Sequence, residues 1–379
     1  MSANNKKSWF YLLLVWIFSI LCFNIILFFI NNEAVLGGYL TPNHKAVKGI
    51  SHVKKPQEVK GIYITAYTAG TSRVDELVGF IKKNGLNAAV VDVKGPNGEP
   101  AFELKRETLK KYNIGRPLYN PEKVIEKLHK EGIYAIARVF VFQDPFLVEH
   151  EPQFALQKKS GGLWADRKGV KWLDPTHFGV WKYNVDFARE AYEQGFDEVQ
   201  FDYIRFPSDG NLATIKYSGW DGKTPKEIEI EKFFIYTSRV LRGLKIPISA
   251  DLFGLVCCNA NYDLGIGQVL ERALPYFDFV SPMMYPSHYS AGFQGFQNPA
   301  SYPYEVVKYS MQEANKKLDA LKIATSTPVG GLRPWIQDFD IGDNYDAGKI
   351  FAQIRATEEE HADGFLIWNA RNVYTTLTP

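Results

Sequence analysis

Apolar residues gather in eight short runs along the chain from Lys60 onward, and segments of helical periodicity separate these runs. Each run has the length of a buried strand, and the runs are residues 61–67, 87–94, 133–142, 197–204, 247–254, 278–285, 322–329 and 364–369. Between them, apolar residues recur at helical spacing, as at Val74, Leu77, Val78 and Ile81. Near-continuous apolar strands that alternate with helices are typical of a parallel sheet covered by helices. The pattern predicts an α/β fold, a (β/α)8 TIM barrel, over residues 60–379.

An open, doubly wound sheet is the alternative arrangement of such strands. It would place a Gly-rich phosphate loop after the first strand, and the stretch ITAYTAGTSR lacks the GxGxxG pattern. We therefore favour the closed barrel.

Two segments carry helix start signals, Asn120 followed by Pro121 and the capping-box pattern of Thr224, Pro225 and Glu227.

A longer apolar run, residues 9–30, precedes the barrel and contains no charged residue. It is long enough to cross the hydrocarbon core of about 30 Å as a helix, and it lacks the small-residue cleavage site of a signal peptide. Lys6 and Lys7 precede it and no Lys or Arg follows until Lys45, which predicts a cytoplasmic N-terminus. We expect a cytoplasmic tail (1–8), a single-pass transmembrane signal anchor (9–30), a flexible stalk (31–59) and an extracytoplasmic barrel domain (60–379) in the cell membrane.

Composition narrows the function further. The net charge is +2 over 379 residues, which argues against a nucleic-acid partner. The three cysteines, two of them adjacent at Cys257 and Cys258, cannot build a disulfide framework or a Cys-based zinc site. HExxH, HxH and GxSxG motifs are absent. We expect no cofactor and no metal.

Polar residues stand where the predicted strands end, and in a TIM barrel the active site forms at these C-terminal ends. Asp92, Asp202 and Asp251 end strands two, four and five. The other polar or aromatic residues at or just after strand ends are Lys94, Arg138, Arg205, Tyr285, His288, Thr325, Thr327, Trp368 and Asn369. Three carboxylates and several aromatic side chains are thus expected around one mouth.

A carboxylate pair beside aromatic rings is typical of glycosidic bond cleavage. One carboxyl group protonates the leaving oxygen while the other attacks the anomeric carbon or activates water, and the rings pack against sugars. A nearby arginine keeps one carboxylate ionised. Arg205 can do so for Asp202 only if the strand ends near Tyr203, because residues three apart on a strand face opposite sides. Structural roles are the alternative, since a single Asp at a strand end is more often a cap and Arg138 could simply pair with a barrel aspartate.

Several stretches resemble a bacterial family of glycoside-hydrolase-like barrels that carries an FDYIRFP motif and is grouped with the large glycosidase superfamily. They are AVVDVKGPNG (89–98), WLDPTHFGVW (172–181), GFDEVQFDYIRFPSDG (195–210), ISADLFGLV (248–256) and SPMMYPSHY (281–289). The resemblance implies a barrel and carbohydrate hydrolysis. In α-amylase-like barrels the nucleophile ends strand four and the acid ends strand five, which implies Asp202 as nucleophile and Asp251 as acid/base. Those enzymes have Arg two residues before the nucleophile and Glu on strand five, where this chain has Gln200 and Asp251.

The leading hypothesis is a membrane-anchored, extracytoplasmic glycoside hydrolase that cleaves a cell-surface or extracellular polysaccharide or oligosaccharide. Its catalytic pair would be Asp202 and Asp251, and the substrate-binding residues would be Asp92, Lys94, Arg138, Arg205, Tyr285, His288 and Trp368. Two alternatives stay open. One is a degenerate barrel that binds carbohydrate without cleaving it, and the other is a metal-dependent polysaccharide deacetylase or hydrolase that uses Asp92, Asp202 and His288.

Overall fold

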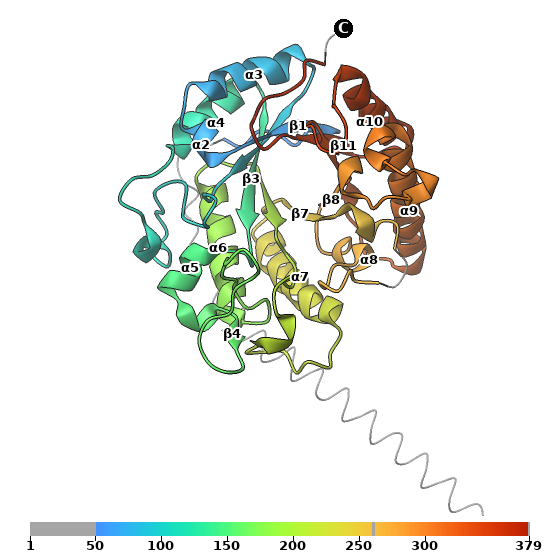
Figure 1. Ribbon diagram of the computed structural model, residues 1–379. Coiled ribbons are helices and arrows are strands. Elements are labelled where there is room, and N and C mark those ends of the chain that lie inside the picture. The colour runs from blue at the N-terminus through green and yellow to red at the C-terminus, as the bar shows by residue number, and fades with distance from the viewer. Residues whose placement is uncertain (1–50, 260–261, 378–379) are drawn as a thin grey trace, which may run out of the picture. The chain divides into compact units, whose positions relative to one another are not determined.

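Parallel strands close into a barrel in the computed structural model of the protein, which describes residues 51–259 and 262–377 (Figure 1). Around the barrel the order is β1 (Val59–Ile64), β2 (Ala88–Asp92), β3 (Tyr134–Phe140), β5 (Glu198–Asp202), β7 (Ile248–Phe253) and β8 (Phe279–Met283). The next position is divided between β9 (Gly331–Leu332) and β10 (Trp335–Gln337), and β11 (Gly364–Trp368) pairs with both β10 and β1. Every pairing in this sheet is parallel, which confirms the predicted closed α/β barrel.

Helices surround the strands, as Figure 1 shows. They are α2 (Ala66–Ala69) and α3 (Arg73–Lys83) after β1, α4 (Pro121–Lys130) after β2, α5 (Pro145–His150) and α6 (Phe178–Glu193) after β3, α7 (Lys226–Gly243) after β5, α8 (Leu270–Ala273) after β7, α9 (Pro303–Ala324) after β8 and α10 (Ala347–Glu359) after β10. Short 3-10 turns lie at Lys110–Tyr112, Pro152–Phe154, Leu212–Thr214, Gly254–Val256, Pro286–His288, Phe293–Gly295 and Pro299–Ser301. A small antiparallel pair, β4 (Gln157–Lys158) with β6 (Ile215–Lys216), joins two loops.

One of the two helix start signals is confirmed. The Asn120 side chain accepts a hydrogen bond from the backbone N–H of Lys123 at 3.1 Å, and α4 begins at Pro121. This is the expected N-cap, with proline in the first helical position. The capping box expected at Thr224 is wrong, because α7 begins at Lys226 without a side-chain cap and the Thr224 hydroxyl donates to a carboxylate outside the helix.

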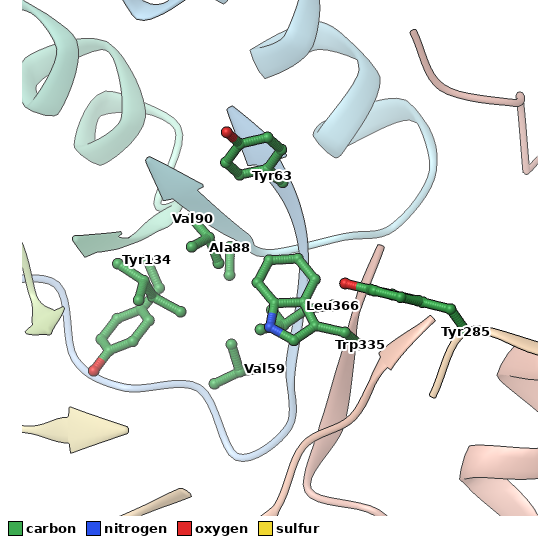
Figure 2. Close-up of a cluster of buried hydrophobic side chains, with 9 residues drawn as sticks. Val59, Tyr63, Ala88, Val90, Tyr134, Tyr285, Trp335 and Leu366 are labelled. Carbon is green, nitrogen blue, oxygen red and sulfur yellow. The ribbon is translucent and has the colours of Figure 1, made fainter. Parts of the chain in front are cut away.

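Side chains from one face of each strand fill the barrel. The buried cluster in Figure 2 contains Val59, Tyr63, Ala88, Val90, Tyr134, Ile136, Tyr285, Trp335 and Leu366. Because side chains alternate between the two faces of a strand, the residues that β1, β2 and β3 contribute lie two or four positions apart. Fully burying one large apolar side chain contributes roughly 1.5–3 kcal/mol to stability. The cluster therefore holds the strands in the register that brings their C-terminal ends to one mouth.

A charged pair also lies inside the barrel. Arg333 and Glu198 are both fully buried, and Arg333 Nη1 lies 3.2 Å from Glu198 Oε2. Arg333 Nη2 also donates to the Ser249 hydroxyl at 3.1 Å. Buried charges require such partners, because removing either one leaves an uncompensated charge.

The seventh strand lies later in the chain than the sequence pattern predicts. The expected strand at residues 322–329 is wrong, because α9 continues to Ala324 and residues 326–328 are exposed, which excludes a barrel strand there. The strand follows at residues 331–337, and Pro334 divides it into β9 and β10 because proline has no N–H to donate. Thr325 and Thr327 therefore do not end a barrel strand, and Trp335 enters the barrel instead.

Residues 51–58 pack against the N-terminal end of the barrel. The backbone N–H of Val53 donates to Asp197 Oδ1 at 2.8 Å, and the His52 ring stacks on Tyr192 with 4.1 Å between centroids. Lys55 Nζ lies 4.5 Å from the centroid of the Phe279 ring. These contacts join residues 51–58 to the barrel domain, and the expected stalk at residues 31–59 stays a prediction.

The expected tail, the anchor at residues 9–30 and the stalk up to residue 50 lie outside the described residues. Within residues 51–259 and 262–377, no helix is long and apolar enough to cross a membrane.

Candidate active site

A cavity of about 460 Å³ opens at the C-terminal ends of the strands. Its walls are built by residues of β3, β5, β7, β8, β10 and β11 and of the loops after them: Arg138, Asp202, Tyr203, Arg205, Asp251, Phe253, Gly254, Leu255, Gln268, Met283, Tyr285, His288, Tyr289, Trp335 and Trp368. Seven of the nine site residues expected from the sequence line this cavity, and both expected catalytic residues and Arg205 are among them.

Strand register brings the charged residues to one level. Asp92 on β2 pairs in register with Arg138 on β3, and Phe140 on β3 pairs with Asp202 on β5. Asp251 lies on β7, next to β5 in the sheet. All four charged residues are at most 5% exposed, so interactions among them are only weakly screened by water.

Arg138 is shared by all three aspartates. Its Nη1 donates to Asp92 Oδ1 at 2.8 Å, and its Nε donates to Asp202 Oδ2 at 3.1 Å, with Nη2 donating to the same Asp202 oxygen. Asp251 Oδ2 lies 3.7 Å from Arg138 Nε. Burial disfavours the charge of Arg138, but the carboxylates of Asp202 and Asp92 outweigh it and hold its pKa well above its ordinary value. This guanidinium is therefore a permanent positive charge in the site.

Asp251 is held by neutral donors. Its Oδ1 accepts hydrogen bonds from Trp335 Nε1, at 2.7 Å, and from Gln200 Nε2. Its Oδ2 is buried and accepts no hydrogen bond from the described residues. Burial first and the neighbouring Asp202 carboxylate second raise the pKa of Asp251 well above the usual range, against the attraction of Arg138. Burial therefore favours the protonated form of Asp251, and the two hydrogen bonds to Oδ1 leave Oδ2 as the position of its proton.

Asp92 lies behind Arg138 and does not line the cavity. Burial raises its pKa, although Arg138 and the hydroxyl of Tyr63, which donates to Asp92 Oδ2, act in the opposite direction. The Tyr63 ring in turn stacks on Trp368, with 4.0 Å between centroids. Asp92 thus orients Arg138 from the side away from Asp202.

The chain turns sharply after β5, and this turn places Arg205. Strand β5 ends at Asp202, and Tyr203 has a φ of 55°, in the left-handed region that residues with side chains rarely adopt. Such a backbone costs on the order of 1–3 kcal/mol and is common at functional sites. The turn also brings the Tyr203 N–H to Asp202 Oδ1, at 2.5 Å, and Arg205 to the cavity wall.

Aromatic rings form the remaining wall. The Arg138 Cζ lies 4.8 Å from the Trp368 centroid, and Tyr285 contacts His288 edge-on at 5.4 Å between ring centroids. Burial lowers the pKa of His288 and raises that of Tyr285, so both side chains are neutral near pH 7. Neutral rings and hydroxyl groups of this kind suit the apolar faces and hydroxyls of a sugar.

Lys94 is placed away from the cavity. Its ammonium group is fully buried and pairs with Asp144 Oδ2 at 2.7 Å, and it also donates to the carbonyl oxygen of Phe140 at 2.9 Å. A substrate cannot reach it, so its position fits a structural ion pair. Within the described part of the chain, no three His, Cys, Asp or Glu side chains form a group that could hold a metal ion.

Three residues around the carboxylates were missed by the sequence analysis. Gln200 stands two positions before Asp202, so the period of two on a strand could have placed it on the same face. Trp335 was missed because the seventh strand was assigned to residues 322–329. Tyr63 lies inside the first predicted strand, where nothing distinguished it from a core residue.

A sequence profile of the family described as "Putative glycosyl hydrolase domain" matches residues 61–374. The chain belongs to this family. The match confirms both the resemblance drawn from the FDYIRFP region and the expected enzyme class, a glycoside hydrolase. No curated protein matches the chain in sequence.

Solved structures resemble this glycosyl hydrolase domain in fold. The glycoside hydrolase domain of PgaB (BpsB) from Bordetella bronchiseptica is 14% identical, with 83% of this chain and 94% of that chain covered at a TM-score of 0.56. The endo-1,4-beta-mannanase from Rhizomucor miehei is 12% identical, with 86% and 91% covered at a TM-score of 0.56. A hypothetical protein from Ruminiclostridium thermocellum is 34% identical, with 50% and 96% covered at a TM-score of 0.46. The similarities to PgaB (BpsB) and to the mannanase support the TIM-barrel fold of the domain.

Proposed function

We propose that the protein hydrolyses a glycosidic bond of a polysaccharide or oligosaccharide, with Asp202 as nucleophile and Asp251 as acid/base. The observation that carries this proposal is that two carboxyl groups on one cavity wall have opposite surroundings. Asp202 is ion-paired with Arg138, whereas Asp251 is bound on Oδ1 by two neutral donors and has its pKa raised by burial. A charged and a protonated carboxyl group side by side are what acid/base glycoside cleavage requires.

The first step follows from these positions. Asp251 donates the proton on Oδ2 to the glycosidic oxygen as the bond from that oxygen to the anomeric carbon breaks. A carboxylate oxygen of Asp202 attacks the same carbon from the opposite face and forms a glycosyl ester. In the second step Asp251, now ionised, takes a proton from water, and the water oxygen displaces Asp202.

We expect retention of anomeric configuration. The Asp202 and Asp251 Oδ2 atoms lie 3.1 Å and 3.7 Å from the same Arg138 Nε. In inverting enzymes the two carboxyl groups are about 6.5–9.5 Å apart, which would require these two oxygens to lie on nearly opposite sides of that nitrogen. In retaining enzymes the two carboxyl groups are only about 5–5.5 Å apart. Proton NMR of the first anomer formed from a cleaved oligosaccharide tests this, and an inverted first product would move Asp202 from nucleophile to general base.

Asp202→Asn and Asp251→Asn test the catalytic pair. Each variant is incubated with a panel of cell-wall and extracellular polysaccharides, and released reducing ends are measured beside wild type. We expect a loss of at least about 100-fold for each variant, because acid/base catalysis contributes roughly 10²–10⁴-fold. Asp319→Asn, on an exposed side chain of α9, is the matched control and should cleave at the wild-type rate.

Unchanged cleavage by folded Asp202→Asn and Asp251→Asn variants would refute these roles. Binding of an oligosaccharide by wild type without release of reducing ends from any member of the panel would favour the degenerate, carbohydrate-binding barrel. Cleavage or deacetylation that stops on addition of a chelator would favour the metal-dependent alternative.

We also propose that the barrel domain is held outside the cell membrane by residues 9–30. The support is the uncharged apolar run with Lys6 and Lys7 before it. Fractionation of cells that make the full chain should place it with membranes, and protease added outside spheroplasts should degrade the barrel. A chain starting at residue 47 that still fractionates with membranes would contradict this proposal.

A further inference from the structure

Arg205 contributes a second positive charge to the cavity wall. Its Cζ lies 4.7 Å from the Trp172 ring centroid, 5.3 Å from that of Phe253 and 5.8 Å from that of Tyr203. Contacts between a guanidinium group and aromatic faces are weaker than ion pairs, but they fix the plane of the group. The three rings therefore present the guanidinium by its edge, where its N–H bonds point.

No carboxylate pairs with Arg205 among the described residues. The buried cations of this part of the chain are different, because each has a carboxylate within 4 Å: Lys94, Arg138, Arg189 and Arg333. The carboxylates of Asp202, Asp209 and Asp166 attract Arg205 only from beyond ion-pair distance, and burial lowers its pKa. A partly buried cation without a paired carboxylate is costly, so an anionic ligand at this position would be favoured.

The hydrogen bonds of Arg205 leave one edge of its guanidinium group, formed by Nε and Nη2, without a partner among the described residues. Nη1 donates to the carbonyl oxygen of Phe206 at 3.2 Å and to the Ser208 hydroxyl at 3.3 Å. Nε and Nη2 donate to no described residue. These two N–H groups point in parallel and match the two oxygens of a carboxylate.

The other cation of the cavity wall has its own partners. Arg138 is ion-paired with Asp92 and with Asp202. Arg205 lies on the same wall without a carboxylate at ion-pair distance among the described residues.

We propose that the Nε and Nη2 edge of Arg205 is a subsite for a carboxylate group on the sugar chain, so that the substrate is an acidic polysaccharide such as one that contains uronic acid residues. This inference rests on the proposed function for the chemistry, but the subsite can be tested by binding alone. Its specificity comes from the charge and the fork of the guanidinium, not from the catalytic pair.

The test compares oligosaccharides that differ only in the carboxyl group. Alginate, polygalacturonate and hyaluronan oligosaccharides are each paired with the same preparation after chemical reduction of the carboxyl to hydroxymethyl groups, and dextran sulfate is paired with dextran. Binding is measured by calorimetry with wild type, Arg205→Gln, Arg205→Lys and the exposed control Arg116→Gln. Thermal unfolding checks that all four proteins are folded.

Wild type and Arg116→Gln should bind at least one carboxylate form about 10- to 100-fold more tightly than its reduced counterpart. Arg205→Gln should abolish that difference, and Arg205→Lys should retain only part of it because lysine lacks the fork. Equal binding of charged and reduced forms, a preference for sulfate alone, equal weakening of both forms in Arg205→Gln, or binding of no member of the panel would each overturn the proposal. If charged oligosaccharides bind through Arg205 but are never cleaved, the catalytic proposal fails and the subsite stands.

Discussion

The hydrogen bond from Trp335 to Asp251 provides a direct test of how the site controls its acid. Trp335→Phe keeps an aromatic ring in the barrel and removes the Nε1–H that lies 2.7 Å from Asp251 Oδ1. Gln200 continues to donate to the same oxygen. The substitution therefore changes one donor while the carboxyl group stays in place.

The expected effect follows from the two protonation states of Asp251. A hydrogen bond to a neutral group contributes about 0.5–1.5 kcal/mol, and one to a charged group about 1.5–3 kcal/mol. Loss of the Trp335 bond therefore destabilises the ionised form more than the protonated form, by roughly 1 kcal/mol. The pKa of Asp251, already raised by burial, should rise further. Because Asp251 acts in its protonated form, the alkaline limb of the pH–rate profile should move to higher pH.

The rate at the optimum should also fall, because Asp251 is less firmly oriented. A loss of about 1 kcal/mol of transition-state stabilisation corresponds to roughly a fivefold lower kcat. The assay is reducing-end release from pH 5 to pH 10 with the best substrate of the panel. Trp181→Phe is the matched control, since Trp181, on α6, donates through Nε1 a bond of the same 2.7 Å length to the Pro175 carbonyl oxygen and does not line the cavity.

An alkaline limb that stays in place or moves to lower pH in Trp335→Phe would refute this account of Asp251. The same shift in Trp181→Phe would show that the effect is general loss of stability. A fall in kcat with an unchanged limb would make Trp335 a packing residue only.

Three further substitutions have defined outcomes. Arg138→Met leaves buried carboxylates without their cation and should lower the free energy of unfolding in urea by about 3–5 kcal/mol, with activity lost. Lys94→Met should lower it by a similar amount by isolating Asp144, while the KM of the folded fraction stays unchanged. Asp251→Asn should change the pH dependence of stability. The folded pKa of Asp251 is raised, so wild-type stability falls as pH rises above the ordinary aspartate value of about 3.9. The advantage of the variant in thermal unfolding should therefore be larger at pH 8 than at pH 4.

Seven of the eight barrel strands could be located from apolar runs, because a strand buried on both faces leaves a continuous signal in the sequence. The exception shows where this signal fails. KIATSTPV is rich in β-branched residues, but the preceding helical periodicity carries α9 through Ala324. The true seventh strand contains a charged residue, Arg333, and a proline, Pro334, which interrupts helices and strands. Arg333 is compatible with the barrel interior only because it pairs with the distant Glu198.

Convergence of Asp202, Asp251 and Arg138 could be predicted because all strand ends of a parallel barrel meet at one mouth. Two features needed three-dimensional structure. Lys94 lies only two residues beyond Asp92, yet it faces Asp144 away from the cavity, because β2 ends at Asp92 and the alternation that would keep the two side chains on one face stops there. Arg205 was expected to support Asp202, but the left-handed Tyr203 turns it toward Trp172 instead.

The arginine and Gln200 together explain how this barrel departs from the α-amylase-like layout. In that layout an arginine stands two residues before the nucleophile, where this chain has Gln200. Arg138 is the register partner of Gln200 on the neighbouring strand, so the guanidinium enters the barrel at the same level from one strand away. The amide then serves Asp251 while the cation serves Asp202. Because one carboxyl group receives the cation and the other a neutral donor, the exchange gives the two carboxyl groups different surroundings, which is the asymmetry that the proposed acid and nucleophile require.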